Sequence, residues 1–289
     1  MTRIAANSSE TADDATPVNA VAFQRILCAV DGTRSATEAA RQATTLAGPD
    51  TRLTFIAVAD HAGVGPTAMA ELSPDHAAQA LQAARSSARE AGIAAETGLV
   101  EAPDPREAIL NAAREHDLLV LGNPPRSSAA GIMLGATASF AVHSSPKPVL
   151  FARPPREIEF PQRIVVASDG SRGSIAVVEL AVKIASEHGA HATLVNTGRH
   201  APLERDYRIA EEATMLFEGL DVEAIVVTDD TPAHEAIVQV AEREHASLII
   251  MGSRGLAGIA ALKSVSERVA HTAPCSVLVV RPHDEEPER

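Results

Sequence analysis

Tryptophan is absent from this 289-residue sequence, and aromatic residues make up only 2% of it. Hydrophobic residues still account for 45%, so the core must be built from alanine, valine, isoleucine and leucine. Small and β-branched side chains of this kind are typical of helices packed closely on a buried parallel sheet. A chain of this length is expected to form about two domains.

Cysteine is scarce as well. Cys28 and Cys275 lie in or next to apolar, strand-like runs, and no CxxC motif occurs, so both are predicted to be buried structural thiols of a cytoplasmic protein. No apolar run approaches the roughly 18 residues that span a bilayer. The formal net charge of -13 argues against nucleic acid or an anionic membrane as the main partner.

An internal duplication organises the chain. The block "RILCAVDGTRS" from Arg25 matches "RIVVASDGSRG" from Arg163, and "EAILNAAREHDLLVLG" later matches "EAIVQVAEREHASLIIMG". Near the end of each copy, "KPVLFARP" matches "CSVLVVRP". Three matched blocks in the same order indicate two copies of one unit.

The composition between and beyond the copies suggests the boundaries. The segment "PPREIEFPQ" is proline-rich and charged, which is typical of a linker, and both chain ends are polar. We therefore expect a disordered N-terminal tail, a first domain, a linker, a second domain and an acidic tail at residues 1–23, 24–153, 154–162, 163–283 and 284–289.

Within each copy, short apolar strands alternate with alanine-rich helices, and Ser73 with Pro74 marks one helix start. This alternation predicts right-handed strand–helix–strand units and a doubly wound parallel sheet. Such sheets bind ligands outside the carboxyl ends of their strands. Two features fall at such ends: Asp31 and Asp169 after the first strand, and Gly122 and Gly252 after the fourth.

Asp31 and Asp169 stand in the matched turns "DGT" and "DGS". A carboxylate at this place accepts a hydrogen bond from an adenine amino group or a ribose hydroxyl. It serves equally well as the N-cap or Asx-turn residue of the next helix. The residues alone leave both interpretations open, because both use the same oxygens.

The fourth strand of the second copy leads into "GSRGLAGIAALKSVSERV". Gly252 and Gly255 would let the backbone approach a phosphate, Arg254 adds charge, and Ser264 with Glu267 forms a capping box for the next helix. The alternative is a plain strand-to-helix connection.

The first copy differs in this loop. It reads "GNPPRSSAAGIMLGATASF", in which Pro125 has no N–H to donate and Thr137 is the candidate helix cap. Gly135 aligns with Lys263, and the loop of the second copy is two residues shorter.

Other motifs are missing. The sequence contains neither a Walker A pattern nor GxSxG, so no catalytic reaction is assigned. His234 opens a helix in the second copy, where it either approaches the ligand cleft or lies solvated on the surface.

Together, "VDGTRS", "SDGSRG", "GSRG" and "SVSERVAHTAPCSVLVVRP" resemble the universal stress protein family, as a tandem over residues 24 to 283. The resemblance implies two tandem Rossmann-like α/β domains, each a five-stranded parallel sheet with helices on both faces. Members of the family that bind nucleotides carry G-x2-G-x9-G-[ST] after strand four. The first copy reads G-x2-P-x9-G-A and the second G-x2-G-x7-K-S, so each departs from the pattern at a different place.

The resemblance also implies a site. Asp31, Asp169 and Val58 would face adenine, with Thr197 in place of that valine in the second copy. The residues that would hold ribose and phosphates are Gly122, Arg126, Gly135, Ala136 and Thr137 in the first copy, and Gly252, Ser253, Arg254, Gly255, Lys263, Ser264 and Val265 in the second.

We therefore expect a nucleotide-responsive stress-response module that binds ATP in at least one domain, with Mg²⁺ present only together with ATP. Pairing through the fifth strands, either within the chain or in a homodimer, is a further implication of the resemblance. Two alternatives stay open: a member that works through an unknown protein partner without nucleotide, and an enzyme such as an ATPase.

Overall fold

The computed structural model describes residues 2–5, 21–59, 72–124, 135–168, 172–197, 215–217, 220–227, 231–253 and 265–281. These residues form two compact units. The first domain is Phe23–Pro154, and the second domain comprises the residues from Pro155 onward together with those before Phe23. The tandem organisation predicted from the duplication is thus present in the structure.

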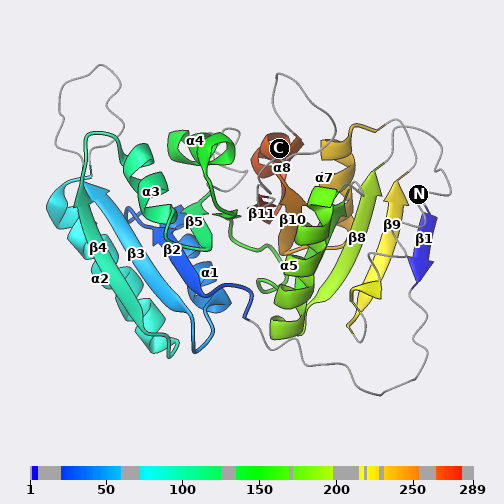
Figure 1. Ribbon diagram of the computed structural model, residues 1–289, viewed down its shortest axis with the longest axis horizontal. Coiled ribbons are helices and arrows are strands. Elements are labelled where there is room, and N and C mark those ends of the chain that lie inside the picture. Colours follow the sequence, from blue (N-terminus) through cyan, green and yellow to red (C-terminus); the bar gives the residue numbers. More distant parts are fainter. Residues whose placement is uncertain are drawn as a thin grey trace, which may run out of the picture. The chain divides into compact units, whose positions relative to one another are not determined.

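The first domain alternates strands and helices along the chain. Its strands are β2 (Arg25–Ala29), β3 (Arg52–Ala59), β4 (Ala95–Glu101), β5 (Leu118–Gly122) and β6 (Val149–Ala152), and its helices are α1 (Arg34–Leu46), α2 (Pro74–Glu90), α3 (Pro105–Ala113) and α4 (Ala136–Ser144). The strands lie in the order β6-β5-β2-β3-β4, and every neighbouring pair is parallel. Helix α1 packs against α2, and α3 against α4 (Figure 1).

The second domain repeats this plan. Its described elements are β7 (Arg163–Ser168), α5 (Arg172–His188), β8 (His191–Thr197), β9 (Val222–Val227), α7 (Ala233–Arg243), β10 (Leu248–Gly252), α8 (Val265–Thr272) and β11 (Ser276–Val280). Five parallel strands lie in the order β9-β8-β7-β10-β11. The predicted α/β class and the five parallel strands of each copy are therefore confirmed.

One strand was not expected. Strand β1 (Thr2–Ala5) pairs antiparallel with β9 at the edge of the second sheet, where the disordered tail of residues 1–23 was predicted. That tail prediction is wrong for these four residues, because backbone pairing with a sheet edge needs little side-chain hydrophobicity. The segment "LERDYRIAEEATMLFEGL" stands where the first copy has the helix that begins at Pro74, which predicts a helix over residues 203–220. Most of these residues lie outside the described residues.

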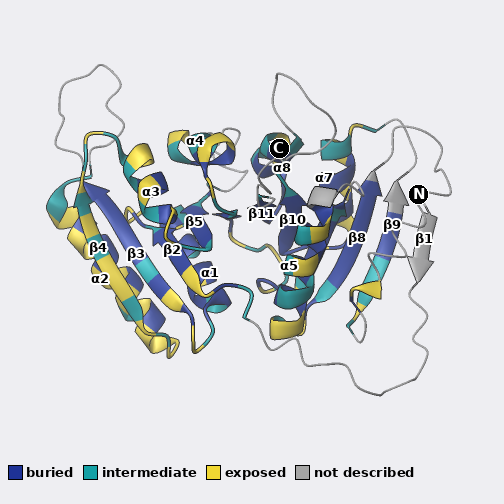
Figure 2. Ribbon diagram, in the orientation of Figure 1, coloured by how far each residue is buried: buried dark blue, intermediate teal, exposed yellow. Residues whose placement is uncertain are grey.

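The strands form the core of each domain (Figure 2). Phe55, Leu118 and Phe151 of the first sheet and Ile164 and Ile225 of the second are among the largest fully buried side chains. Cys28 and Cys275 are both buried, as the sequence predicted. Burial raises the pKa of the Cys28 thiol, and the nearby Asp31 carboxylate raises it further, so this thiol stays neutral and unreactive.

A close backbone contact fixes where α1 begins relative to β5. A Cβ atom on Gly122 would lie 2.5 Å from the carbonyl carbon of Ser35 and 2.7 Å from the backbone nitrogen of Ala36. Only glycine fits this approach without displacing backbone atoms. The end of β5 therefore rests directly on the first turn of α1.

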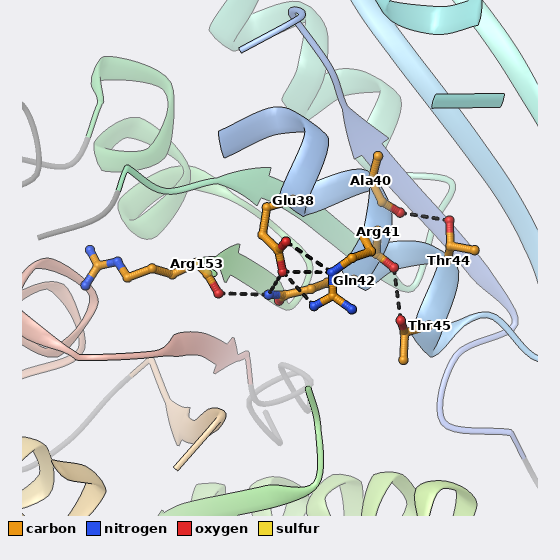
Figure 3. Close-up of polar contacts among 7 residues, drawn as sticks. All are labelled: Glu38, Ala40, Arg41, Gln42, Thr44, Thr45 and Arg153. Atoms are coloured by element: carbon orange, nitrogen blue, oxygen red, sulfur yellow. Dashed lines mark hydrogen bonds and ion pairs between the residues drawn. The ribbon is translucent and has the colours of Figure 1, made fainter. Parts of the chain in front are cut away.

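Helix α1 is also tied to the end of the domain by Gln42, whose side chain is fully buried. Its amide Nε2 donates one hydrogen bond to Glu38 Oε1 at 2.7 Å and another to the carbonyl oxygen of Arg153 at 2.9 Å (Figure 3). The Glu38 carboxylate also receives the guanidinium of Arg41 at 2.7 Å. The amide thus joins α1 to the residue that follows β6.

We predict that Gly122→Ala destabilises the first domain by about 1–3 kcal/mol, because the new methyl group would overlap the α1 backbone. Gly98→Ala in β4 is the matched control, since a Cβ atom there meets nothing within 4 Å. Urea denaturation of both variants measures the difference. Equal free energies of unfolding would contradict the contact.

We predict that Gln42→Leu lowers the free energy of unfolding by about 1–3 kcal/mol, because a leucine of similar size cannot donate to the buried carbonyl of Arg153. Thr45→Ala on the same helix removes a bond from Thr45 Oγ1 to the Arg41 carbonyl at 3.0 Å, and it should change stability by less than about 0.5 kcal/mol. Thermal and urea unfolding compare the two variants, and similar losses in both would refute the special role of Gln42.

Candidate functional site

The first sheet switches its direction of growth between β2 and β5. The chain adds β3 and β4 on one side of β2, then returns to place β5 and β6 on the other. Open parallel sheets bind ligands at this kind of switch, outside the carboxyl ends of the strands. Asp31 lies two residues after the end of β2 and Gly122 ends β5, so the structure brings these two predicted residues to neighbouring strand ends. Their role in binding stays a prediction.

Asp31 is exposed, and one of its two carboxylate oxygens is engaged. Its Oδ1 accepts hydrogen bonds from the backbone N–H of Thr33 at 2.9 Å and from the Thr33 hydroxyl at 2.7 Å. This is an Asx turn, one of the two interpretations that the sequence left open. Oδ2 makes no hydrogen bond within the described part of the chain, so this oxygen remains available as an acceptor.

The turn itself is completed by Gly32 and Thr33. Gly32 has a φ of +80°, a left-handed conformation that favours glycine. Thr33 is the N-cap of α1, and its hydroxyl accepts from the backbone N–H of Ala36 at 3.2 Å. The N-cap role considered for Asp31 therefore belongs to Thr33. Asp31 orients this cap by accepting a hydrogen bond from the Thr33 hydroxyl.

Val58 lies near the carboxyl end of β3, opposite Val100 of β4, and is only 6% exposed. Its side chain belongs to the core, so only the backbone atoms of Val58 could contact a ligand at the strand end. Asn123, one residue after Gly122, is 1% exposed and donates its N–H to the carbonyl of Ala152 at 2.8 Å. Sequence reasoning missed this buried amide, because a single asparagine after a strand reads as a turn residue.

The start of α4 differs from the prediction. The N-cap is Gly135, which provides no side-chain cap bond, and Ala136 is the first helical residue. Thr137, predicted as the cap, lies inside the first turn, because the helix begins two residues earlier than a threonine cap requires. Gly135 and Ala136 are exposed, with nothing near a Cβ atom on the glycine.

In the second domain the structure describes part of the predicted site. Gly252 ends β10, Thr197 ends β8 and Val265 begins α8. Ser253 donates its N–H to the carbonyl of Val280 at 2.9 Å, and its buried hydroxyl has no hydrogen-bond partner among the described residues. Outside the described residues lie Arg126 of the first copy and Asp169, Arg254, Gly255, Lys263 and Ser264 of the second.

The two domains differ in the residues at the carboxyl ends of their first two strands. In the second domain Ser168 ends β7 and pairs in register with Asn196 of β8, and both are buried. The Ser168 hydroxyl donates to that of Ser174 on α5 at 3.1 Å, while Asn196 Nδ2 finds no acceptor in the described segments. Val30 and Ala57 hold the corresponding places in the first domain. The second domain is thus polar where the first is apolar.

The helix that follows the third strand carries a second difference. Arg106, in the first turn of α3, donates hydrogen bonds from Nε and Nη2 to the two carboxylate oxygens of Asp104. Its guanidinium carbon lies 5.4 Å from the ring centre of Phe140 on α4. His234 occupies the corresponding place on α7. Its pKa is lowered first by burial and then by the charge of Arg268 on α8. Its side chain is 16% exposed, so the His234 ring is largely covered but still reaches solvent.

The described residues also bear on metals and membranes. Within the described ranges, no three His, Cys, Asp or Glu side chains come together to hold a metal ion. None of the helices that the structure describes is long and apolar enough to cross a membrane.

Known proteins match this chain over both domains. The sequence model of the universal stress protein family matches residues 22–153 and again residues 161–281. A universal stress protein of Thermus aquaticus is 35% identical over 135 residues, which cover 41% of this chain and 97% of that protein. The universal stress protein YxiE of Bacillus subtilis is 30% identical over 147 residues, covering 41% and 98%.

A solved universal stress protein of Archaeoglobus fulgidus has a similar fold, with a TM-score of 0.74 at 22% identity over 90% of this chain and 98% of that one. The two family matches cover both copies of the duplication. The chain therefore belongs to the universal stress protein family and carries two of its domains in tandem.

Proposed function

We propose that the chain is a stress-response module that binds an adenine nucleotide, in the first instance ATP, at the carboxyl edge of at least one of its sheets. The free Oδ2 of Asp31 carries this proposal. The two hydrogen bonds from Thr33 to Oδ1 fix the carboxylate. They also fix the position of Oδ2, close to where the strand order switches between β2 and β5. A fixed acceptor at this place suits an adenine amino group or a ribose hydroxyl.

The shape of the turn supports the same proposal. Gly122 lets β5 end directly against the first turn of α1, and the N-terminus of α1 adds a favourable dipole for negative charge. The exposed Gly135 and Ala136 begin α4, which presents a second helix N-terminus. Phosphates are the groups that such helix starts favour.

For the second domain the proposal rests on different groups. The buried hydroxyl of Ser253 and the amide of Asn196 lack partners among the described residues, and a buried polar group without a partner costs about 1–3 kcal/mol. A bound ligand or water would supply what they lack. The two domains would therefore hold nucleotide with different strength.

The proposed module is cytosolic and works by occupancy, without catalytic turnover: bound nucleotide orders the site and alters the affinity for a partner. Mg²⁺ is proposed only as a companion of ATP. Pairing through the fifth strands, within the chain or in a homodimer, is proposed as the route by which occupancy reaches a partner.

A second candidate function is a module that acts through protein contacts alone. Two observations favour it: the Asx turn of Asp31 already explains that residue, and the packing against α1 already explains Gly122. Under this alternative the carboxyl edge holds no nucleotide, and the two functions are separated by a binding measurement.

We predict that the wild-type chain binds ATP and that Asp31→Asn weakens binding to the first domain roughly 10- to 100-fold, the loss expected for a hydrogen bond to a charged group. Asparagine keeps the acceptor for the Thr33 turn but presents N–H₂ in place of Oδ2. Asp50→Asn is the matched control, because Asp50 is exposed and precedes β3 at the opposite edge of the sheet. Calorimetry and native mass spectrometry measure affinity and stoichiometry.

The same measurement decides between the two functions. Absence of bound nucleotide at millimolar ATP in the wild type would leave only the protein-contact function. Binding that is equally strong in Asp31→Asn and wild type, with one nucleotide per chain, would move the site to the second domain, where Asp169→Asn is the corresponding change.

A further inference from the structure

The outer edge strands of the two sheets differ in whether another strand covers them. β4 and β9 are counterparts in the duplication, and each is the last parallel strand on its side of its sheet. Within the described residues β4 has no strand beyond it, whereas β9 is covered by β1. Thr2, Arg3, Ile4 and Ala5 pair antiparallel with Val226, Ile225, Ala224 and Glu223 in that order.

The composition of the two edge strands explains the difference. β4 reads AETGLVE, with Gly98 at its centre and Glu96 bonded to Arg52 at 3.0 Å. Charges and a glycine at an edge discourage pairing with another chain. β9 reads VEAIVV, with one acidic residue, and its Ala224 and Ile225 are 1% and 2% exposed. A short, apolar, β-branched segment without proline is a sequence that pairs readily when its edge is free.

A further contact ties the start of the chain to the second domain. The backbone N–H of Ala22 donates to Glu187 Oε1 of α5. The chain thus contacts the second domain at β1 and again just before Phe23, where the first domain begins. Thr2–Ala5 and Ala22 are therefore structurally part of the second domain.

We propose that the β9 edge is a strand-acceptor surface whose occupant is the chain's own Thr2–Ala5, and that this occupant prevents β9 from pairing with the β9 edge of a second copy. Backbone hydrogen bonds supply the affinity in this mode of recognition. A four-residue strand is held by few such bonds and opens at low cost. Release of β1 therefore converts a closed edge into a self-association surface, independently of the nucleotide site.

A disulfide tests the occupant. Thr2 and Val226 are Cα partners, and partners across an antiparallel pair lie about 4.5–5.5 Å apart, within disulfide range. Thr2→Cys with Val226→Cys should form an intrachain disulfide under mild oxidation. Thr2→Cys with Glu223→Cys, three residues out of register, is the matched control. Peptide mapping that finds equal crosslinking in both, or crosslinks between chains in place of within one, overturns the proposal.

Proline tests what the occupant does. Arg3→Pro with Ile4→Pro removes two backbone donors from β1, whereas Arg3→Val with Ile4→Val changes the same residues and keeps both N–H groups. In the proline variant, hydrogen exchange at the amides of β9 should become roughly tenfold faster in dilute solution, with β4 unchanged. Its mass by light scattering should rise with concentration above that of the valine variant. Unchanged exchange at β9 would overturn the proposal that β1 covers this edge. Faster exchange with identical masses would overturn the proposal that β1 prevents self-association.

Discussion

The absence of a side chain at Gly122 is the constraint on which the candidate site depends. The end of β5 lies so close to the first turn of α1 that a Cβ atom would stand 2.5 Å from a backbone carbon of that turn. This approach positions the N-cap Thr33, and Thr33 in turn orients the carboxylate of Asp31. Packing and the geometry of the turn are thus coupled: the fold itself requires glycine at position 122, and the turn uses only Oδ1 of the Asp31 carboxylate.

The duplication shows how one frame can carry two different sites. Both copies keep the parallel strand order and the glycine at the end of the fourth strand. At the carboxyl ends of the first two strands, the second copy has Ser168 and Asn196 where the first copy has Val30 and Ala57. On the neighbouring helices, the first copy sets a cation on α3 beside an aromatic ring on α4, and the second sets the His234 ring on α7 near the Arg268 cation on α8. The frame is common, and the polar groups near the carboxyl ends of the strands are specific to each copy.

Much of the fold could be predicted because its signals are local or repeated. Apolar runs such as "LLVLG" and "LIIMG" marked strands, and Ser73 with Pro74 marked the start of α2, where the serine hydroxyl indeed caps the helix. The antiparallel β1 could not be predicted, because its four residues carry no alternation and its partner lies more than two hundred positions away. The cap of α4 was misplaced because Gly135 begins the helix without any side-chain bond. Asn123 and Asn196 were missed because burial of an amide depends on tertiary packing.

Helix α1 joins two places that are far apart in the sequence. Its first turn lies beside the candidate site, and about two turns later Gln42 donates a hydrogen bond to the carbonyl of Arg153, the last residue before Pro154 ends the domain. A single buried amide therefore joins the helix that begins at the candidate site to the point where the chain leaves the first domain.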